Sequence, residues 1–306
     1  YIIWLNLSIQ NYIFTMNIIA DTELILSKEK KIYHLNLSKE EIADTIILVG
    51  DPERVELVSN KFDKIYCKIK HREFNTHTGL INKKKISVIS TGIGPDNIDI
   101  VINELDALVN IDFNTRFQNK KYKSLNIIRL GTCGALQKNI KVDTLIASSY
   151  ALGLDNLAHF YSNKKVINKD ISKAFTNHMN WTKELSTPYV VEASKNLLNL
   201  FKNMNKGITA TAPGFYGPQG RQLRIPPSIN QLEEKMQDFK FKNLQIKNFE
   251  METSALYYLG RTLGHNTLTI CAVIGNRLSK KYSENYYFTV NKMIDIVLKR
   301  ISSSSY

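Results

Sequence analysis

Short apolar runs alternate with amphipathic segments along most of the chain. Four of these runs are rich in aliphatic residues, and each leads into a turn that contains glycine, as is typical of buried strands. They are residues 45–49, 85–90, 126–130 and 268–274. Strands of this kind are covered by helices on both faces, so the pattern predicts an α/β fold. Ligands in such folds bind beyond the carboxyl ends of the strands.

Helices are predicted between and after these strands. Asp51 is a suitable N-cap, and Pro52 is a suitable first helical residue because a helix start leaves its N–H groups without helical partners. Farther along the chain, apolar side chains recur at helical spacing. The predicted helices cover residues 53–62, 98–108 and 288–301.

No internal repeat or change in composition marks a second domain, so we expect one domain over residues 21–301. Within it, 110–124 and 155–190 are interpreted as insertions or loops. Residues 1–20 carry no charge, and they lack the basic region and the cleavage site of a signal peptide. Their polar residues disfavour a membrane span, so we expect a non-native or disordered extension, with a membrane anchor as the alternative. The final serines predict a frayed tail over 302–306.

Charge and cysteine content exclude some classes of function. The net charge is +13, from 41 Lys and Arg against 28 Asp and Glu. The lysines are scattered, whereas a nucleic-acid-binding protein would cluster them among aromatic residues, so we expect no nucleic-acid partner. The three cysteines show neither disulfide nor metal spacing, which predicts a reducing, cytoplasmic location and no metal cofactor.

Three loops combine an arginine with glycine or a helix start. Gly50 and Arg54 follow the first predicted strand, where helix N-terminal amides and a guanidinium favour an anion. Arg72 lies in a second loop, and Arg129 and Thr132 flank the glycine turn after the third strand. Taken singly, each is more typical of a turn with a solvated charge. Together on one edge of a sheet, they suit free phosphate.

The turn at residues 215–221 combines an aromatic ring, an amide and a guanidinium. Phe215 can stack on a flat base, Gln219 offers a donor and an acceptor, and Arg221 offers donors only. That set matches uracil, whose edge presents a carbonyl, an N–H and a second carbonyl. The alternative is a surface turn with a buried Phe215.

Glu250, Met251 and Glu252 form an acidic triplet. In an extended segment the two glutamates point to one face and Met251 to the other. Two neighbouring carboxylates repel each other, and hydrogen bonds from the vicinal hydroxyls of a sugar would offset this repulsion. The alternative is a strand end with two solvated glutamates.

Seven segments, taken in this order, resemble the pyrimidine-specific branch of the nucleoside phosphorylase family. The likeness runs from His34 to about Ile301, and its segments are 50–55, 71–74, 90–94, 129–134, 215–221, 249–252 and 274–277. It implies a single-domain, three-layer α/β/α fold with a central mixed, partly barrel-like sheet. It also implies a homo-oligomer, a dimer or a trimer of dimers, whose subunits share active sites.

The resemblance assigns roles to individual positions. Those matching phosphate ligands are Gly50, Arg54, Arg129 and Thr132, joined by Arg72 from the neighbouring subunit. Those matching ribose ligands are His34, also from the neighbouring subunit, Glu250, Met251 and Glu252. Those matching base ligands are Phe215, Gln219 and Arg221. The catalytic positions are Arg54, Arg129, Arg221 and Glu252.

The implied reaction is phosphorolysis of uridine to uracil and ribose 1-phosphate, with phosphate as co-substrate. We expect no cofactor and no association with a membrane. A monovalent cation near Glu73 at the subunit interface is compatible with the resemblance. The alternatives are a purine nucleoside phosphorylase or a nucleosidase on the same scaffold. Purine enzymes place an Asp after the late strand, where this chain has Asn276. One departure is the order Gly-Pro-Gln-Gly-Arg at 217–221, which predicts a different backbone turn.

Overall fold

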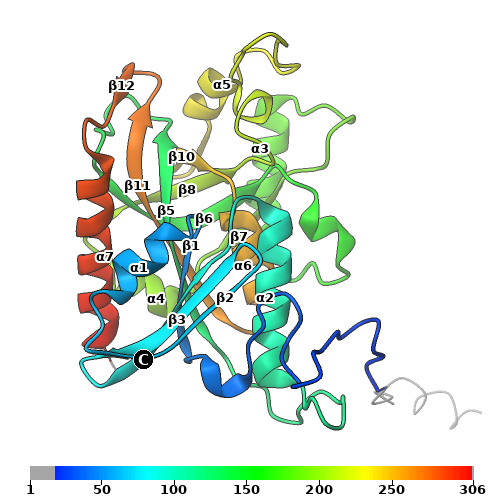
Figure 1. Ribbon diagram of the computed structural model, residues 1–306. Helices are drawn as coiled ribbons and strands as arrows, with labels where there is room; N and C mark the ends of the chain where they lie inside the picture. The colour runs from blue at the N-terminus through cyan, green and yellow to red at the C-terminus, as the bar shows by residue number, and fades with distance from the viewer. Residues whose placement is uncertain (1–17, 305–306) are drawn as a thin grey trace, which may run out of the picture.

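A computed structural model describes residues 18–304 and shows an α/β architecture built around one large sheet (Figure 1). The predicted N-terminal extension lies outside the described residues up to position 17. Of its remainder, Ile19 and Ala20 are attached to the domain, because the Arg116 side chain donates to their carbonyl oxygens at 2.6 and 2.9 Å. The insertion at 110–124 therefore holds the start of the described chain.

The chain enters the fold through alternating strands and helices. The strands are β1 (Thr45–Val49), β2 (Lys64–His71), β3 (Phe74–Ile81), β4 (Lys84–Ser90), β5 (Asn126–Ala135), β6 (Leu145–Gly153), β7 (Tyr189–Glu192), β8 (Asn205–Thr211), β9 (Lys240–Phe241), β10 (Leu244–Glu250), β11 (Asn266–Asn276) and β12 (Lys281–Tyr282). The helices are α1 (Glu53–Ser59), α2 (Pro95–Asn110), α3 (Lys169–Met179), α4 (Lys195–Asn199), α5 (Leu232–Asp238), α6 (Thr253–Thr262) and α7 (Tyr286–Ser302).

The four strands expected from apolar runs are present as β1, β4, β5 and β11, and all five residues of β1 are buried. The predicted helix after β1 is also present, although α1 ends at Ser59 rather than Phe62. The N-cap of α1 is Pro52 rather than the expected Asp51, although Asp51 Oδ1 accepts from the backbone N–H of Glu53 at 2.9 Å.

The sheet is mixed, and part of it closes on itself. β1 pairs in parallel with β4 and β5, while β2, β3 and β4 form an antiparallel meander. Beyond β5 the strands form a ring, β5–β11–β6–β8–β10, because β10 also pairs with β5. This confirms the expected mixed, partly barrel-like sheet.

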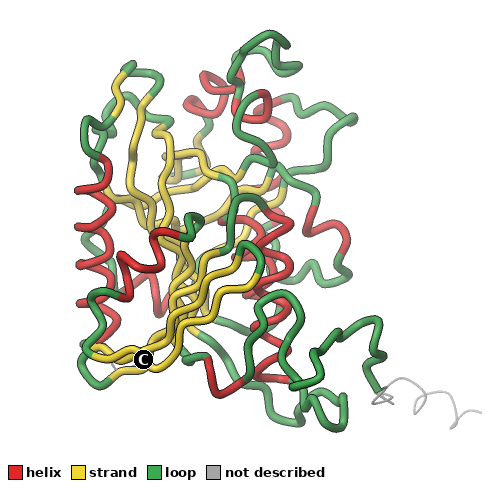
Figure 2. Tube along the Cα trace, in the orientation of Figure 1, coloured by secondary structure: helices red, strands yellow, loops and turns green. Residues whose placement is uncertain are grey.

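Helices cover the sheet on two sides (Figures 1 and 2). α1 and α7 lie on one side, where α7 packs against β11 and β5. α6 lies on the other side, between the sheet and α2, and its residues from Thr253 to Gly260 are all buried. The result is the predicted three-layer arrangement. Among residues 18–304, no helix has both the length and the apolar character needed to cross a bilayer.

The interpretation of 155–190 as a loop is wrong in its second half. This segment contains α3 and leads into β7, which pairs with β6. Ile171, Phe175 and Met179 recur every four residues and are buried, so the helical signal was present in the sequence. Asn168 caps the helix by accepting from the backbone N–H of Ile171 at 3.1 Å.

Candidate active site

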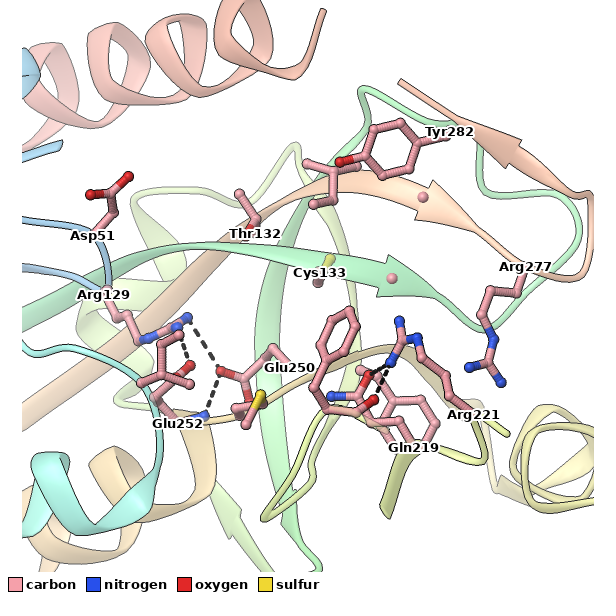
Figure 3. Close-up of a pocket in the computed structure, with 18 of the residues that line it drawn as sticks. Asp51, Arg129, Thr132, Cys133, Gln219, Arg221, Glu250, Glu252, Arg277 and Tyr282 are labelled. Carbon is pink, nitrogen blue, oxygen red and sulfur yellow. Dashed lines mark hydrogen bonds and ion pairs between the residues drawn. The ribbon is translucent and has the colours of Figure 1, made fainter. Parts of the chain in front are cut away.

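A cavity of about 990 Å³ opens at the carboxyl ends of β1, β5, β10 and β11. Its walls come from the loops that the sequence singled out, together with the segment after β11 (Figure 3). The predicted site residues that line it are Gly50, Arg54, Arg129, Thr132, Phe215, Gln219, Arg221, Glu250, Met251 and Glu252. Residues far apart in the chain thus meet where ligands of such sheets bind.

Arg129, on β5, is the charged centre of the inner wall and is only 4% exposed. Its Nη2 pairs with Glu252 Oε2, and its Nη1 lies 3.2 Å from Glu250 Oε2 (Figure 3). Burial alone would lower the pKa of Arg129, but the two carboxylates outweigh it and raise that pKa. The guanidinium is therefore a permanent cation. Within the part of the chain that the structure describes, its Nε and Nη1 make no hydrogen bond.

Glu250 is fully occupied by protein donors. Its Oε1 accepts from the Thr211 hydroxyl at 2.6 Å, and its two oxygens accept from the backbone N–H groups of Glu252 and Thr253 at 3.0 Å. A carboxylate that already accepts these bonds holds Arg129 and the start of α6 in place. This geometry favours a positioning role for Glu250 over the expected contact with ribose.

The acidic triplet is not fully extended, because β10 ends at Glu250 and Glu252 is the N-cap of α6. The strict alternation of faces is therefore wrong, and Met251 lines the same cavity as the two glutamates. Glu252 Oε1 accepts from the backbone N–H of Gly94 at 2.9 Å. Gly94 has a φ of 104°, a conformation that favours glycine. Burial raises the pKa of Glu252, opposed by Arg129 and aided by Glu250.

A second guanidinium faces the cavity from α1. Arg54 Nη1 donates to the carbonyl oxygen of Leu130 at 3.2 Å. Burial lowers the pKa of Arg54, and the nearby charge of Arg129 lowers it further. The buried cation of Arg129 and the half-buried cation of Arg54 repel each other unless an anion lies between them or beside them. Arg54, Arg129 and the Thr132 side of β5 therefore form a site suited to an anion.

The turn at residues 215–221, called the base-recognition turn after its expected role, carries Arg221 folded back over Phe215. The Arg221 guanidinium lies 3.8 Å from the Phe215 ring centroid, and its Nη1 donates to the Phe215 carbonyl oxygen and to Gln219 Oε1 at 2.6 and 2.5 Å. Phe215 is 50% exposed, so the alternative of a buried ring is wrong. The cation covers one face of the ring, and the Tyr216 ring packs against Phe215 in a T-shaped contact with centroids 5.3 Å apart.

Sequence reasoning missed Arg277, which follows β11 and also lines the cavity. Burial and the charge of Arg221 lower the pKa of Arg277 to about 10. Its Nη2 forms an ion pair with Glu233 of α5. Arg277 lies in one of the segments that carry the family resemblance, but no spacing in the sequence indicates a partner on a distant helix.

His34, Arg72 and Glu73 are not among the residues that line this cavity in the described chain. His34 Nδ1 lies 2.6 Å from Glu104 Oε1, and Arg72 donates to the Tyr33 hydroxyl at 2.9 Å. The Tyr33 ring contacts both residues, so His34 and Arg72 belong to one surface cluster. Their assignment concerned a neighbouring subunit, and it stays a prediction.

The fold and the cavity define an enzyme of the phosphorylase type. The chain belongs to the phosphorylase superfamily, whose profile matches residues 44–302. It is 29% identical over 259 residues to a uridine phosphorylase from Thermococcus kodakarensis, covering 82% of this chain and 80% of the relative. It is also 29% identical over 272 residues to a DeoD-type purine nucleoside phosphorylase from Bacillus velezensis, covering 88% of this chain and 99% of the relative.

A solved structure supports the same class. A Trypanosoma brucei nucleoside phosphorylase with uridine phosphorylase activity superposes with a TM-score of 0.82 at 29% sequence identity. The match covers 92% of this chain and all of the other. Relatives of the pyrimidine and purine classes are thus equally similar in sequence, and the base has to be argued from the site.

Proposed function

We propose that this enzyme cleaves the N-glycosidic bond of uridine with inorganic phosphate and releases uracil and ribose 1-phosphate. The observation that carries the proposal is the unpartnered Nε–H of buried Arg129. Its Nε has no hydrogen-bond partner among the described residues, whereas Nη1 forms an ion pair with Glu250 and Nη2 forms one with Glu252. A buried donor without a partner is costly, so the site is built for an acceptor that enters with the substrate.

Phosphate supplies that acceptor. Arg54 and Arg129 hold its oxygens on one side of the ribose, and Thr132 adds a hydroxyl donor from β5. As the glycosidic bond lengthens, the ribose becomes positive, the phosphate oxygen forms the new bond to C1′, and the bonding electrons leave with uracil. Charge held in place before the reaction is usually the largest contribution to catalysis.

Glu252 is the residue suited to the ribose hydroxyls. It is 3% exposed, and its ion pair with Arg129 fixes it beside the phosphate position. An ionised carboxylate has more lone pairs than its contacts to Arg129 and Gly94 use, so it can accept a further hydrogen bond. Arg129 would therefore bind phosphate, and its ion-pair partner Glu252 would bind the ribose hydroxyls.

The base end of the cavity favours uracil. Arg221 and Arg277 offer donors only, which suits carbonyl oxygens and the negative charge that uracil carries as it leaves. The same donors reject the amino group of cytosine, because two donors would face each other.

Asn276 argues against a purine substrate. Its Nδ2 donates to the carbonyl oxygens of Gln137 and Ile140 at 3.0 and 2.8 Å, and its Oδ1 accepts from the backbone N–H of Ser279 at 3.1 Å. Both ends of this buried amide are used inside the protein. The position at which purine enzymes carry a proton-donating Asp therefore has a structural role here, which supports the pyrimidine proposal.

A second copy of the chain would complete the site. The described cavity has two arginines at its phosphate end, and the cluster of His34 and Arg72 lies on the surface, outside it. We propose that this cluster enters the cavity of a partner subunit, Arg72 towards phosphate and His34 towards the ribose 5′-hydroxyl.

Base preference tests the proposal. With phosphate in excess, we expect kcat/KM for uridine to exceed that for cytidine by about 10⁴, the discrimination typical of sites that hydrogen-bond the polar edge of a ligand. Inosine should be cleaved no better than cytidine, because the position at which purine enzymes carry an Asp is Asn276 here. The measurement is release of free base by chromatography. Cleavage of inosine at the rate of uridine would contradict the assignment to pyrimidines.

A further inference from the structure

We propose that Glu233, on α5, is a positioning residue for base recognition, because it holds Arg277 beside Arg221 at the base end of the cavity. The inference rests on the proposed function, and it extends the site to a helix that contributes no lining residue. It also gives a function to the ion pair between Glu233 and Arg277, which are far apart in the sequence.

The geometry links three segments. Arg277 follows β11 and lines the cavity, and its Nη2 pairs with Glu233 in the first turn of α5. Gly220, inside the base-recognition turn, lies against both partners. A side-chain carbon at position 220 would stand 3.7 Å from Arg277 Nη2 and 3.8 Å from Glu233 Cγ. The turn that carries Gln219 and Arg221 is therefore in contact with the ion pair.

Electrostatics explains why the carboxylate is needed. Arg277 and Arg221 are like charges at one end of a cavity, and burial together with Arg221 lowers the pKa of Arg277. Without an acidic partner, a long side chain such as that of Arg277 would swing towards solvent, away from the second guanidinium. Glu233 offsets the repulsion and leaves Arg277 with free donors on its other edge.

The backbone under Glu233 is firmly held. Leu232 and Met236 of α5 are buried in a hydrophobic cluster that also contains Phe175 of α3. In addition, His178 of α3 lies with its Nε2 2.8 Å from the carbonyl oxygen of Lys235. The segment that the sequence presented as an insertion thus supports the helix that carries Glu233.

The test compares Glu233→Gln with Glu233→Asp, and it uses Glu234→Gln as the matched control. Glu234 is the next residue on α5, is exposed and has no part in the cavity. We expect Glu233→Gln to raise the KM for uridine about 10- to 100-fold, the range that follows from displacing a binding group by about 1 Å. The KM for phosphate should stay within about twofold, and Glu233→Asp should recover part of the loss. Glu234→Gln should match the wild type.

Arg277→Ala supplies the second arm. If Glu233 acts through Arg277, adding Glu233→Gln to Arg277→Ala should change the uridine KM little further, since coupled residues are not additive. A wild-type uridine KM for Glu233→Gln, additive effects of the two changes, or an equal rise in the phosphate KM would overturn the inference. A wild-type enzyme that does not cleave uridine would instead defeat the proposed function, so the two failures are distinguishable.

Discussion

Replacing Arg129 with Gln is expected to lower kcat/KM for uridine by about 10³-fold or more. Loss of one preorganised donor typically costs a rate factor of about 10²–10³. This change removes the cation proposed to bind phosphate together with its ion pairs to Glu250 and Glu252. The KM for phosphate should rise and kcat should fall together. The measurement is steady-state kinetics with each substrate varied in turn, and Arg116→Gln serves as control because Arg116 binds the chain near Ile19. Arg129→Gln with wild-type kinetics would contradict the proposed anion site.

The same substitution should destabilise the protein by about 3–5 kcal/mol, because it leaves two buried carboxylates without their cation. The loss should depend on pH. Arg129 is what holds down the already raised pKa of Glu252, so this pKa rises further in the variant. A carboxyl whose folded pKa lies above its unfolded value destabilises the fold as pH rises through that interval. The difference in Tm from wild type should therefore be larger at pH 8 than at pH 5.5, as calorimetry can show.

Replacing Arg221 with Ala is expected to raise the KM for uridine by about 10²-fold, with a smaller effect on the KM for phosphate. Arg221 and Arg277 line the same cavity, and under the proposed function Arg221 would also stabilise the departing uracil anion. Its loss should thus lower kcat as well.

Arg224→Ala is the matched control for this variant, since Arg224 lies three residues on in the same loop and is exposed. It should leave both Michaelis constants unchanged. Equal increases in the KM for uridine and for phosphate in Arg221→Ala would contradict base recognition by Arg221. They would indicate instead that the turn at 215–221 shapes the whole cavity.

The sequence predicts the buried strands well, because β1, β4, β5 and β11 each contain several buried aliphatic residues close together. Closure of the ring could not be predicted from the sequence, since it depends on β10 pairing with β5 through two residues only, Asn248 and Phe249. Local patterns carry no information on such long-range register. α3 was missed for another reason. Its helical spacing is present, but the polar segments around it resemble a loop.

In the candidate site, too, the sequence predicts some features and not others. Arg54, Arg129 and Glu252 could be predicted because they lie in segments that together resemble one family, whereas each segment taken singly is as typical of a solvated charge. Geometry was the part that could not be predicted. Glu250 and Glu252 both line the cavity, but Glu250 ends β10 and Glu252 is the N-cap of α6. Glu250 accepts hydrogen bonds from backbone donors of the protein. Glu233 pairs with Arg277 because α5 lies against the turn at residues 215–221, a contact that local sequence patterns do not predict.

The phosphate requirement of uracil release tests the central claim most directly. Uridine is incubated with the enzyme in buffer with and without inorganic phosphate, and uracil, ribose 1-phosphate and free ribose are quantified. We expect uracil and ribose 1-phosphate in equal amounts with phosphate, and neither product without it. Uracil released together with free ribose in phosphate-free buffer would show that water is the nucleophile. That result would contradict the assignment of Arg54 and Arg129 to phosphate.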